Sequence, residues 1–165
     1  MTADIEWPSK FLPGTTDNFV SNEVIVKDVD ISKIWKLLVN PTKWESYYSN
    51  CAKITPPNPG PELKKGDHFS FSTFGFPPLS CIVNESIKPE QTTPGRLAWM
   101  TDEEQNGIDV YHAWIIENLE GGRVRILTQE SQLGDAARQL AEEKPNKMLN
   151  GHQDWLDGLV EAARK

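Results

Sequence analysis

Apolar and polar residues alternate over residues 19–26, near the start of the chain. Val20, Val24 and Val26 fall on one face, and Ser21 falls on the other. A period of two with many β-branched residues is typical of a strand that buries one face. The fold therefore begins with a strand at about residue 18. Residues 1–17 contain Pro and Gly without a sustained period, which predicts an extended N-terminal arm.

The period changes to a helical one after this strand. Asp30 is a suitable N-cap, and Asn40 and Pro41 end the pattern, which predicts a short helix. Residues 42–48 can form a second short helical turn that places Trp44 inward. The apolar positions that define the first helix are Ile31, Ile34, Trp35 and Leu38.

Extended segments dominate the middle of the chain. A short strand over residues 52–55 and a loop rich in Pro and Gly come first. Gly and Pro separate the following segments at lengths typical of hairpins, which predicts an antiparallel meander. These segments are HFSFSTF, LSCIVNESI, GRLAWMT, IDVYHAWIIENL and RVRILTQES. Residues 135–165 return to helical spacing and predict a long amphipathic helix, interrupted near Pro145.

One strand, two short helices, about six strands and a long closing helix make an α+β arrangement. This order resembles the helix-grip fold of the START/Bet v 1-like (SRPBCC) superfamily, which includes polyketide cyclase/dehydrase and lipid-transport proteins. The segments that carry the resemblance are DISKIWKLLVNPTKWESYY, LKKGDHFSF, HAWIIENLEGGRVRILTQESQLG and the closing helix. The resemblance implies a single domain over residues 18–165. In it, a curved antiparallel sheet of about seven strands wraps around the C-terminal helix and encloses a cavity for a small, largely apolar ligand.

Strand parity selects two candidate catalytic residues. Glu130 shares a face with Val124 and Ile126, and His112 shares one with Val110 and Trp114, so both side chains are expected to point inward. A carboxylate and an imidazole in an apolar pocket can transfer protons to and from a substrate. The alternative is structural, because buried imidazoles and carboxylates often only satisfy a neighbouring group.

Inward aromatic positions and one stripe of the closing helix predict the ligand contacts. These side chains can equally form a solid core, because only part of an aromatic stripe lines a pocket. The predicted contacts are Trp44, Tyr48, Phe69, Phe71, Trp99, Trp114, Met148, His152 and Trp155.

Composition narrows the class of protein. The net charge of −7 disfavours nucleic acid as a partner, since phosphate groups would be repelled. The two cysteines cannot form a disulfide framework, and the N-terminus lacks the features of a signal peptide, which favours a cytoplasmic location. The sequence contains no apolar run long enough for a membrane span. It carries no signal for an oligomeric state.

Motif searches predict neither a cofactor nor a metal. The sequence contains no GxGxxG, Walker, HExxH or GxSxG motif, and the spacing of His68, His112 and His152 indicates no convergent triad with an acid. The leading interpretation is a protein that binds a small hydrophobic ligand, such as a polyketide-like, lipid or other cyclic molecule. If it is an enzyme, it is a cofactor-independent cyclase or dehydratase. A non-catalytic carrier and a chaperone-cofactor-like interaction module are the alternatives.

Overall fold

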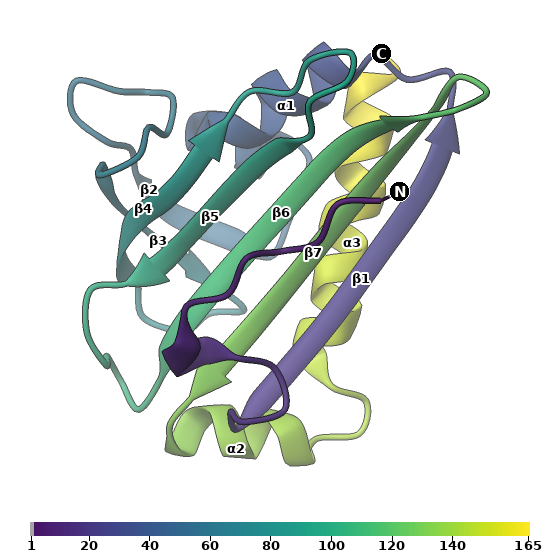
Figure 1. Cartoon of the computed structure of the whole chain (residues 1–165). Coiled ribbons are helices and arrows are strands. Elements are labelled where there is room, and N and C mark those ends of the chain that lie inside the picture. Colours follow the sequence, from purple (N-terminus) through teal and green to yellow (C-terminus); the bar gives the residue numbers. More distant parts are fainter. Residues whose placement is uncertain (1) are drawn as a thin grey trace.

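Seven antiparallel strands form one curved sheet in the computed structural model, which describes residues 2–165 (Figure 1). Strands β2 to β7 form a meander, and β1 pairs with β7 at the edge, which gives the order β1-β7-β6-β5-β4-β3-β2. The strands are β1 (Asn18–Lys27), β2 (Cys51–Thr55), β3 (His68–Thr73), β4 (Leu79–Ile87), β5 (Gly95–Thr101), β6 (Asp109–Leu119) and β7 (Arg123–Leu133). The predicted α+β helix-grip architecture is confirmed.

The helices also follow the sequence pattern. Asp30 caps α1 by accepting a hydrogen bond from the Ser32 amide at 2.8 Å, and the break at Pro145 divides the closing region into two helices. The helices are η1 (Ser9–Phe11), α1 (Ile31–Val39), η2 (Pro41–Ser46), α2 (Asp135–Glu142) and α3 (Lys147–Ala163). Within residues 2–165, no helix combines the length and apolar character that a membrane crossing requires.

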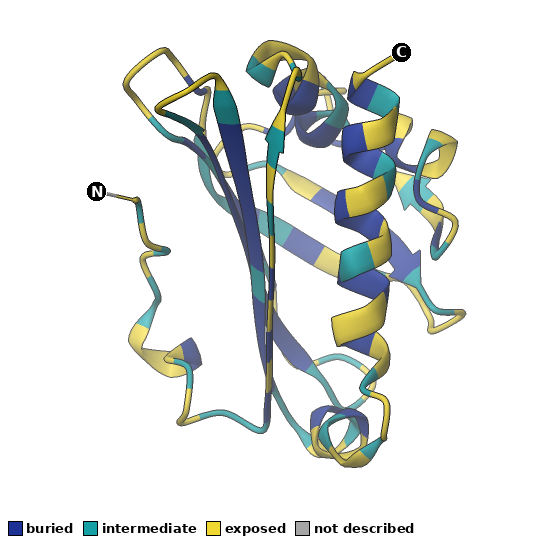
Figure 2. Cartoon of the chain, turned by 90° about the vertical axis from the view of Figure 1, so that its right-hand side faces the viewer, coloured by how far each residue is buried: buried dark blue, intermediate teal, exposed yellow. Residues whose placement is uncertain are grey.

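The main core lies between the inner face of the sheet and helices α1 and α3. Ile34 and Leu38 of α1, Ile126 of β7 and Leu159 of α3 are fully buried there. Figure 2 shows the sheet edge-on, with α3 on one side and the N-terminal segment on the other. Helix α3 therefore covers the same sheet face toward which His112 and Glu130 were predicted to point.

The N-terminal segment covers the opposite face of the sheet. Trp7 and Phe11 pack on Tyr111 of β6, with ring centroids 5.5 and 5.8 Å apart. This packing explains why the outward positions of β6, Tyr111 and Ala113, are apolar and buried. The predicted arm includes Met1, which lies outside the described residues. The division of the chain into an arm and one domain stays a prediction.

Candidate functional site

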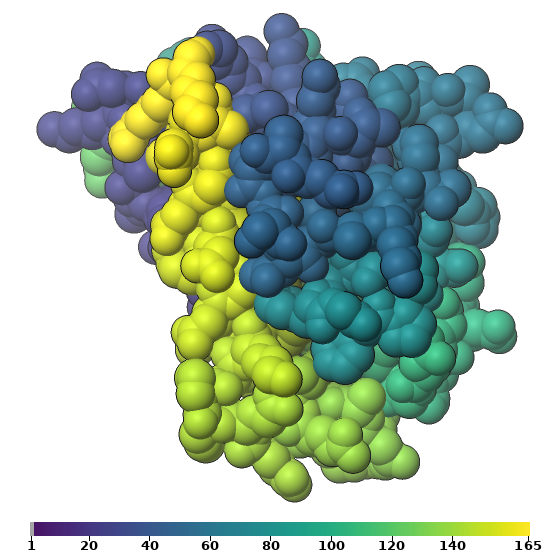
Figure 3. All heavy atoms as spheres, turned by 180° about the vertical axis from the view of Figure 1, so that it is seen from behind, coloured from purple at the N-terminus to yellow at the C-terminus, as the bar shows by residue number. Residues whose placement is uncertain are grey.

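A cavity of about 110 Å³ lies between α3, α2, the inner face of the sheet and the β3–β4 turn. Figure 3 shows the outer side of this region, where α3 in yellow lies beside residues of η2 and the β3–β4 turn in blue and teal. Most of the cavity wall is apolar. The apolar and aromatic lining includes Phe71, Phe76, Pro77, Leu79, Cys81, Trp99, Ile108, Val110, Leu140, Met148 and Trp155.

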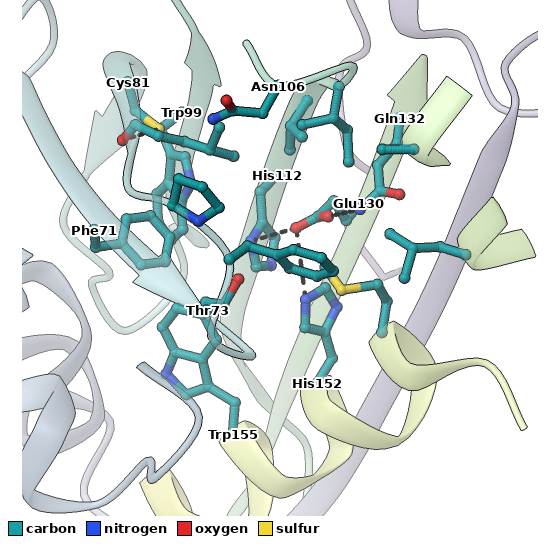
Figure 4. Close-up of a pocket in the computed structure, with 18 residues that line it drawn as sticks. Phe71, Thr73, Cys81, Trp99, Asn106, His112, Glu130, Gln132, His152 and Trp155 are labelled. Atoms are coloured by element: carbon teal, nitrogen blue, oxygen red, sulfur yellow. Dashed lines mark hydrogen bonds and ion pairs between the residues drawn. The ribbon is translucent and has the colours of Figure 1, made fainter. Parts of the chain in front are cut away.

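A buried polar cluster forms one wall of this cavity. His112 Nδ1 lies 3.1 Å from Glu130 Oε1, and His152 Nε2 lies 3.5 Å from the same oxygen (Figure 4). The side chains are only 2 to 5% exposed. The three residues come from β6, β7 and α3, so the cluster exists only in the folded chain. Spacing along the sequence had indicated no such triad.

The hairpin between β6 and β7 brings His112 and Glu130 together. The two residues are direct partners in the antiparallel register, so their side chains lie on the same face of the sheet. The turn after β6 contains Gly121 and Gly122, whose φ angles of +81° and +69° suit residues without a side chain. The inward orientation predicted for both residues is therefore found.

Thr128 contacts the second nitrogen of the His112 ring. The Thr128 hydroxyl donates to the Ala113 carbonyl at 3.2 Å, and its oxygen lies 2.8 Å from His112 Nε2. With Glu130 at Nδ1 and Thr128 at Nε2, both ring nitrogens of His112 have a polar partner.

A chain of amides holds the other oxygen of Glu130. The Gln132 amide donates to Glu130 Oε2, and its own oxygen accepts from Asn18 Nδ2 at 2.8 Å. Asn18 in turn accepts from Asn146 Nδ2 at 3.1 Å, while Asn146 Oδ1 caps α3 by accepting from the Met148 amide at 2.9 Å. Since the cap needs an oxygen, every amide in this relay has one orientation, and Oε1 is left for the histidines.

Burial and neighbouring charges decide the ionisation of this cluster. Burial opposes ionisation of Glu130, but the charges of His112 and His152 and hydrogen bonds from His112 and Gln132 outweigh it and lower its pKa. Burial, followed by the charge of His112, lowers the pKa of His152 to about 3. Glu130 is therefore an anion and His152 a neutral imidazole at pH 7.

The β3–β4 turn closes the cavity against α3. Phe74 packs with Met148 and Leu140, and its ring lies so close to Gly151 that a side chain at Gly151 would overlap it. The Ser72 hydroxyl donates to the Phe76 carbonyl inside the same turn. Phe76 and Pro77 line the cavity from this side.

The structure divides the predicted ligand contacts into two groups. Phe71, Trp99, Met148, His152 and Trp155 line the cavity, as do the candidate catalytic residues His112 and Glu130. The other predicted contacts pack in the adjacent aromatic core and do not line the cavity; they are Trp44, Tyr48, Phe69 and Trp114. A ligand-contact role for either group stays a prediction.

Several polar residues of the site were missed in the sequence, including Thr73 and Asn106 of the cavity wall. Thr128 and Gln132 lie two residues before and after Glu130, so strand parity alone places them on the same face. Asn18 is the cross-strand partner of Gln132 at the start of β1. The parity signal was present, but only the pairing of β1 with β7 identifies Asn18.

No protein-family model matches the sequence, and no curated protein matches it. Among solved structures, a hypothetical protein from Helicobacter pylori is similar over almost its whole length. It has 47% identity and a TM-score of 0.92, and the match covers 99% of this chain and 98% of that one.

Two more distant structures share the fold alone. A START superfamily protein from Mycobacterium smegmatis has 10% identity and a TM-score of 0.58, over 88% of this chain and 94% of that one. The di-domain ARO/CYC protein BexL from the BE-7585A biosynthetic pathway has 7% identity and a TM-score of 0.60. That match covers 88% of this chain and 46% of that one.

Proposed function

This chain belongs to the family of the Helicobacter pylori protein and has the START-like (SRPBCC) fold, and we propose that it binds a small ligand in its internal cavity. The ligand is compact and mostly apolar, with one polar group that contacts Glu130 and His152. The observation that carries the proposal is a buried, fully assembled polar cluster on the wall of an otherwise apolar cavity. Such convergence of a few polar groups in an apolar pocket is typical of small-molecule sites.

The size of the cavity favours a compact ligand. An engineered cavity of about 150 Å³ in another protein accommodates benzene. At about 110 Å³, this cavity suits a molecule with roughly one ring and has no room for a long acyl chain or a polycyclic polyketide in the conformation described. Larger cyclic ligands require the β3–β4 turn to move away from α3.

The polar wall favours chemistry over simple transport. A carrier of hydrophobic molecules needs no buried ionised group, and burying one costs free energy unless it is paired. Glu130 and His112 lie where they can exchange a proton with a bound ligand, which is the acid and base arrangement of a cofactor-independent cyclase or dehydratase. A chaperone-like module, in contrast, would fill its cavity with side chains.

Titration calorimetry with phenol tests the binding proposal. Phenol has one ring and one polar group, and we expect one molecule to bind per chain. Ala136→Phe places a ring into the cavity and is expected to abolish binding, because Ala136 lines it. Gln139→Phe, on the exposed side of the same helix, is the matched control and should bind normally. Equal binding by both variants would contradict the proposal.

Turnover measurements test the enzymatic form. We expect His112→Ala to reduce turnover of small cyclic or polyketide-like substrates by roughly a hundredfold while the fold is retained. Full activity in this variant would remove His112 from the mechanism and leave ligand binding as the function. Circular dichroism verifies that the variant remains folded.

A further inference from the structure

We infer that His112, Glu130 and His152 bind one divalent transition-metal ion of the zinc type, with its open coordination positions facing the cavity. The inference rests on the proposed binding function and deepens it, because the ligand's polar group would then meet the ion instead of exchanging a proton with Glu130 and His112. One ligand atom from each residue lies within 4.8 Å of the other two. Two imidazoles and one carboxylate are a donor set that zinc and iron(II) use in sites that retain open positions.

The separations between the ligand atoms suit a shared ion. A tetrahedral ion about 2.1 Å from each ligand atom separates two of them by about 3.4 Å. His112 Nδ1 and His152 Nε2 lie 3.1 and 3.5 Å from Glu130 Oε1. Both distances are close to the separation expected between two ligand atoms of one ion.

The hydrogen-bond pattern also calls for a cation at this point. Glu130 Oε1 faces one ring nitrogen of His112 and one of His152, and both contacts are buried. A ring nitrogen and a carboxylate oxygen 3.1 Å apart share either a proton or a metal ion. A metal ion satisfies both atoms and His152 Nε2 at once.

Two neighbouring groups orient the ligands as in known metal sites. Metal-bound histidines usually donate their second ring N–H to an acceptor, and here the Thr128 hydroxyl oxygen lies 2.8 Å from His112 Nε2, where it can accept. Gln132 occupies Glu130 Oε2, which leaves Oε1 to bind an ion as a single oxygen ligand. The amide relay from the cap of α3 thus acts on a ligand of the proposed ion.

Ion binding requires the His152 ring to turn. Its ring lies 18° from parallel to that of His112, with centroids 4.6 Å apart, so it must turn about its Cβ–Cγ bond to aim Nε2 at a shared ion. Its Nδ1 is buried and has no hydrogen-bond partner among residues 2–165. The turn therefore breaks no hydrogen bond of that nitrogen.

Zn²⁺ titration of the full chain after dialysis against a chelator tests the inference. We expect one ion per chain, with affinity reduced at least a hundredfold in His152→Ala and about tenfold or more in Gln132→Ala, which removes the amide that holds Glu130 Oε2. His68→Ala removes an exposed histidine paired with Asp102 and should leave the affinity unchanged. Loss of affinity in His68→Ala, or none in His152→Ala, would overturn the inference.

Histidine ring NMR of the wild-type chain keeps the test independent of variant folding. Zn²⁺ should shift the ring signals of His112 and His152 and leave those of His68 in place. Unchanged signals of His112 and His152 would mean that only a proton joins these residues to Glu130, and the metal inference would fail. Phenol binding to the metal-free chain separates the two proposals, because it persists if only the metal inference is wrong.

Discussion

The two ends of the interior, beneath the same helix, are built in opposite ways. At the end near η2, Tyr48 stacks on Trp155 at 4.5 Å and Trp44 meets Trp155 at 5.0 Å, so aromatic rings fill the space. At the end near α2, a cavity remains and its wall carries an ionised carboxylate. Trp155 separates the two, and His152 lies one turn earlier on α3. The comparison shows which end provides packing and which end provides polar groups for binding.

Loss of Trp44 should have the largest effect on stability. Trp44 is fully buried, its ring meets Phe71 at 5.1 Å, and its indole donates to the Leu38 carbonyl at 2.8 Å. We expect Trp44→Ala to lower the free energy of unfolding by about 3–5 kcal/mol, measured by urea denaturation. Trp7→Ala, on the outer face, should cost less because Trp7 is partly exposed. A loss below about 1 kcal/mol for Trp44→Ala would contradict the claim that the end near η2 provides the packing.

Neutralising Glu130 tests the polar end of the interior independently of the packed end. Glu130→Gln keeps the shape but removes the charge that faces His112, and we expect it to cost roughly 1–3 kcal/mol of stability. Phenol affinity should fall about tenfold or more, because a hydrogen bond to a charged group is lost. Toluene has the same ring without the hydroxyl and should bind within about twofold of wild type. Equal losses for both molecules would mean that Glu130 shapes the cavity rather than binding the polar group.

Two glycines of α3 provide a matched pair of substitutions, one at each end of the interior. A side chain at Gly158 would meet the Tyr47 backbone carbonyl, which cannot move aside, so Gly158→Ala should destabilise the fold by about 1–3 kcal/mol. A side chain at Gly151 would meet only the tip of the Phe74 ring. We expect Gly151→Ala to cost less than about 1 kcal/mol, because greater helix propensity offsets the displacement of that ring.

Ligand kinetics measure whether the Gly151 contact closes the cavity. If Phe74 holds the β3–β4 turn against α3, displacing it in Gly151→Ala should speed phenol association, as observed by stopped-flow fluorescence. Gly158→Ala should not change this rate. Faster association in both variants would show general loosening instead.

Two helix caps give the smallest and most specific comparison. Asp30→Ala and Asn146→Ala each remove one cap and should each cost about 1 kcal/mol in thermal unfolding. Only Asn146→Ala also breaks the relay through Asn18 to Gln132 and Glu130, so only this variant should weaken phenol binding. Matching phenol affinities in the two variants would mean that the relay does not orient Glu130.

Local pattern predicted the fold and the orientation of the two strand residues, but not the complete site. His112 and Glu130 lie the same number of residues before and after Gly121. A hairpin turn at the EGG sequence, residues 120–122, therefore also makes them cross-strand partners. His152 could be assigned to an apolar stripe, yet its distance from Glu130 depends on how α3 crosses the sheet. The same limit applies to Trp44 and Trp114, because parity indicates that a ring points inward but not whether it meets a cavity or another ring.

A phenol titration observed through the tryptophan indole signals tests the central claim most directly. Trp99 and Trp155 line the cavity, while Trp7 lies on the outer face and Trp35 in the packed core. The account predicts saturable shifts of the Trp99 and Trp155 signals in two-dimensional NMR, with Trp7 and Trp35 unchanged. Shifts confined to Trp7, or no shift at Trp99 and Trp155 up to millimolar phenol, would contradict the claim that this cavity is the ligand site.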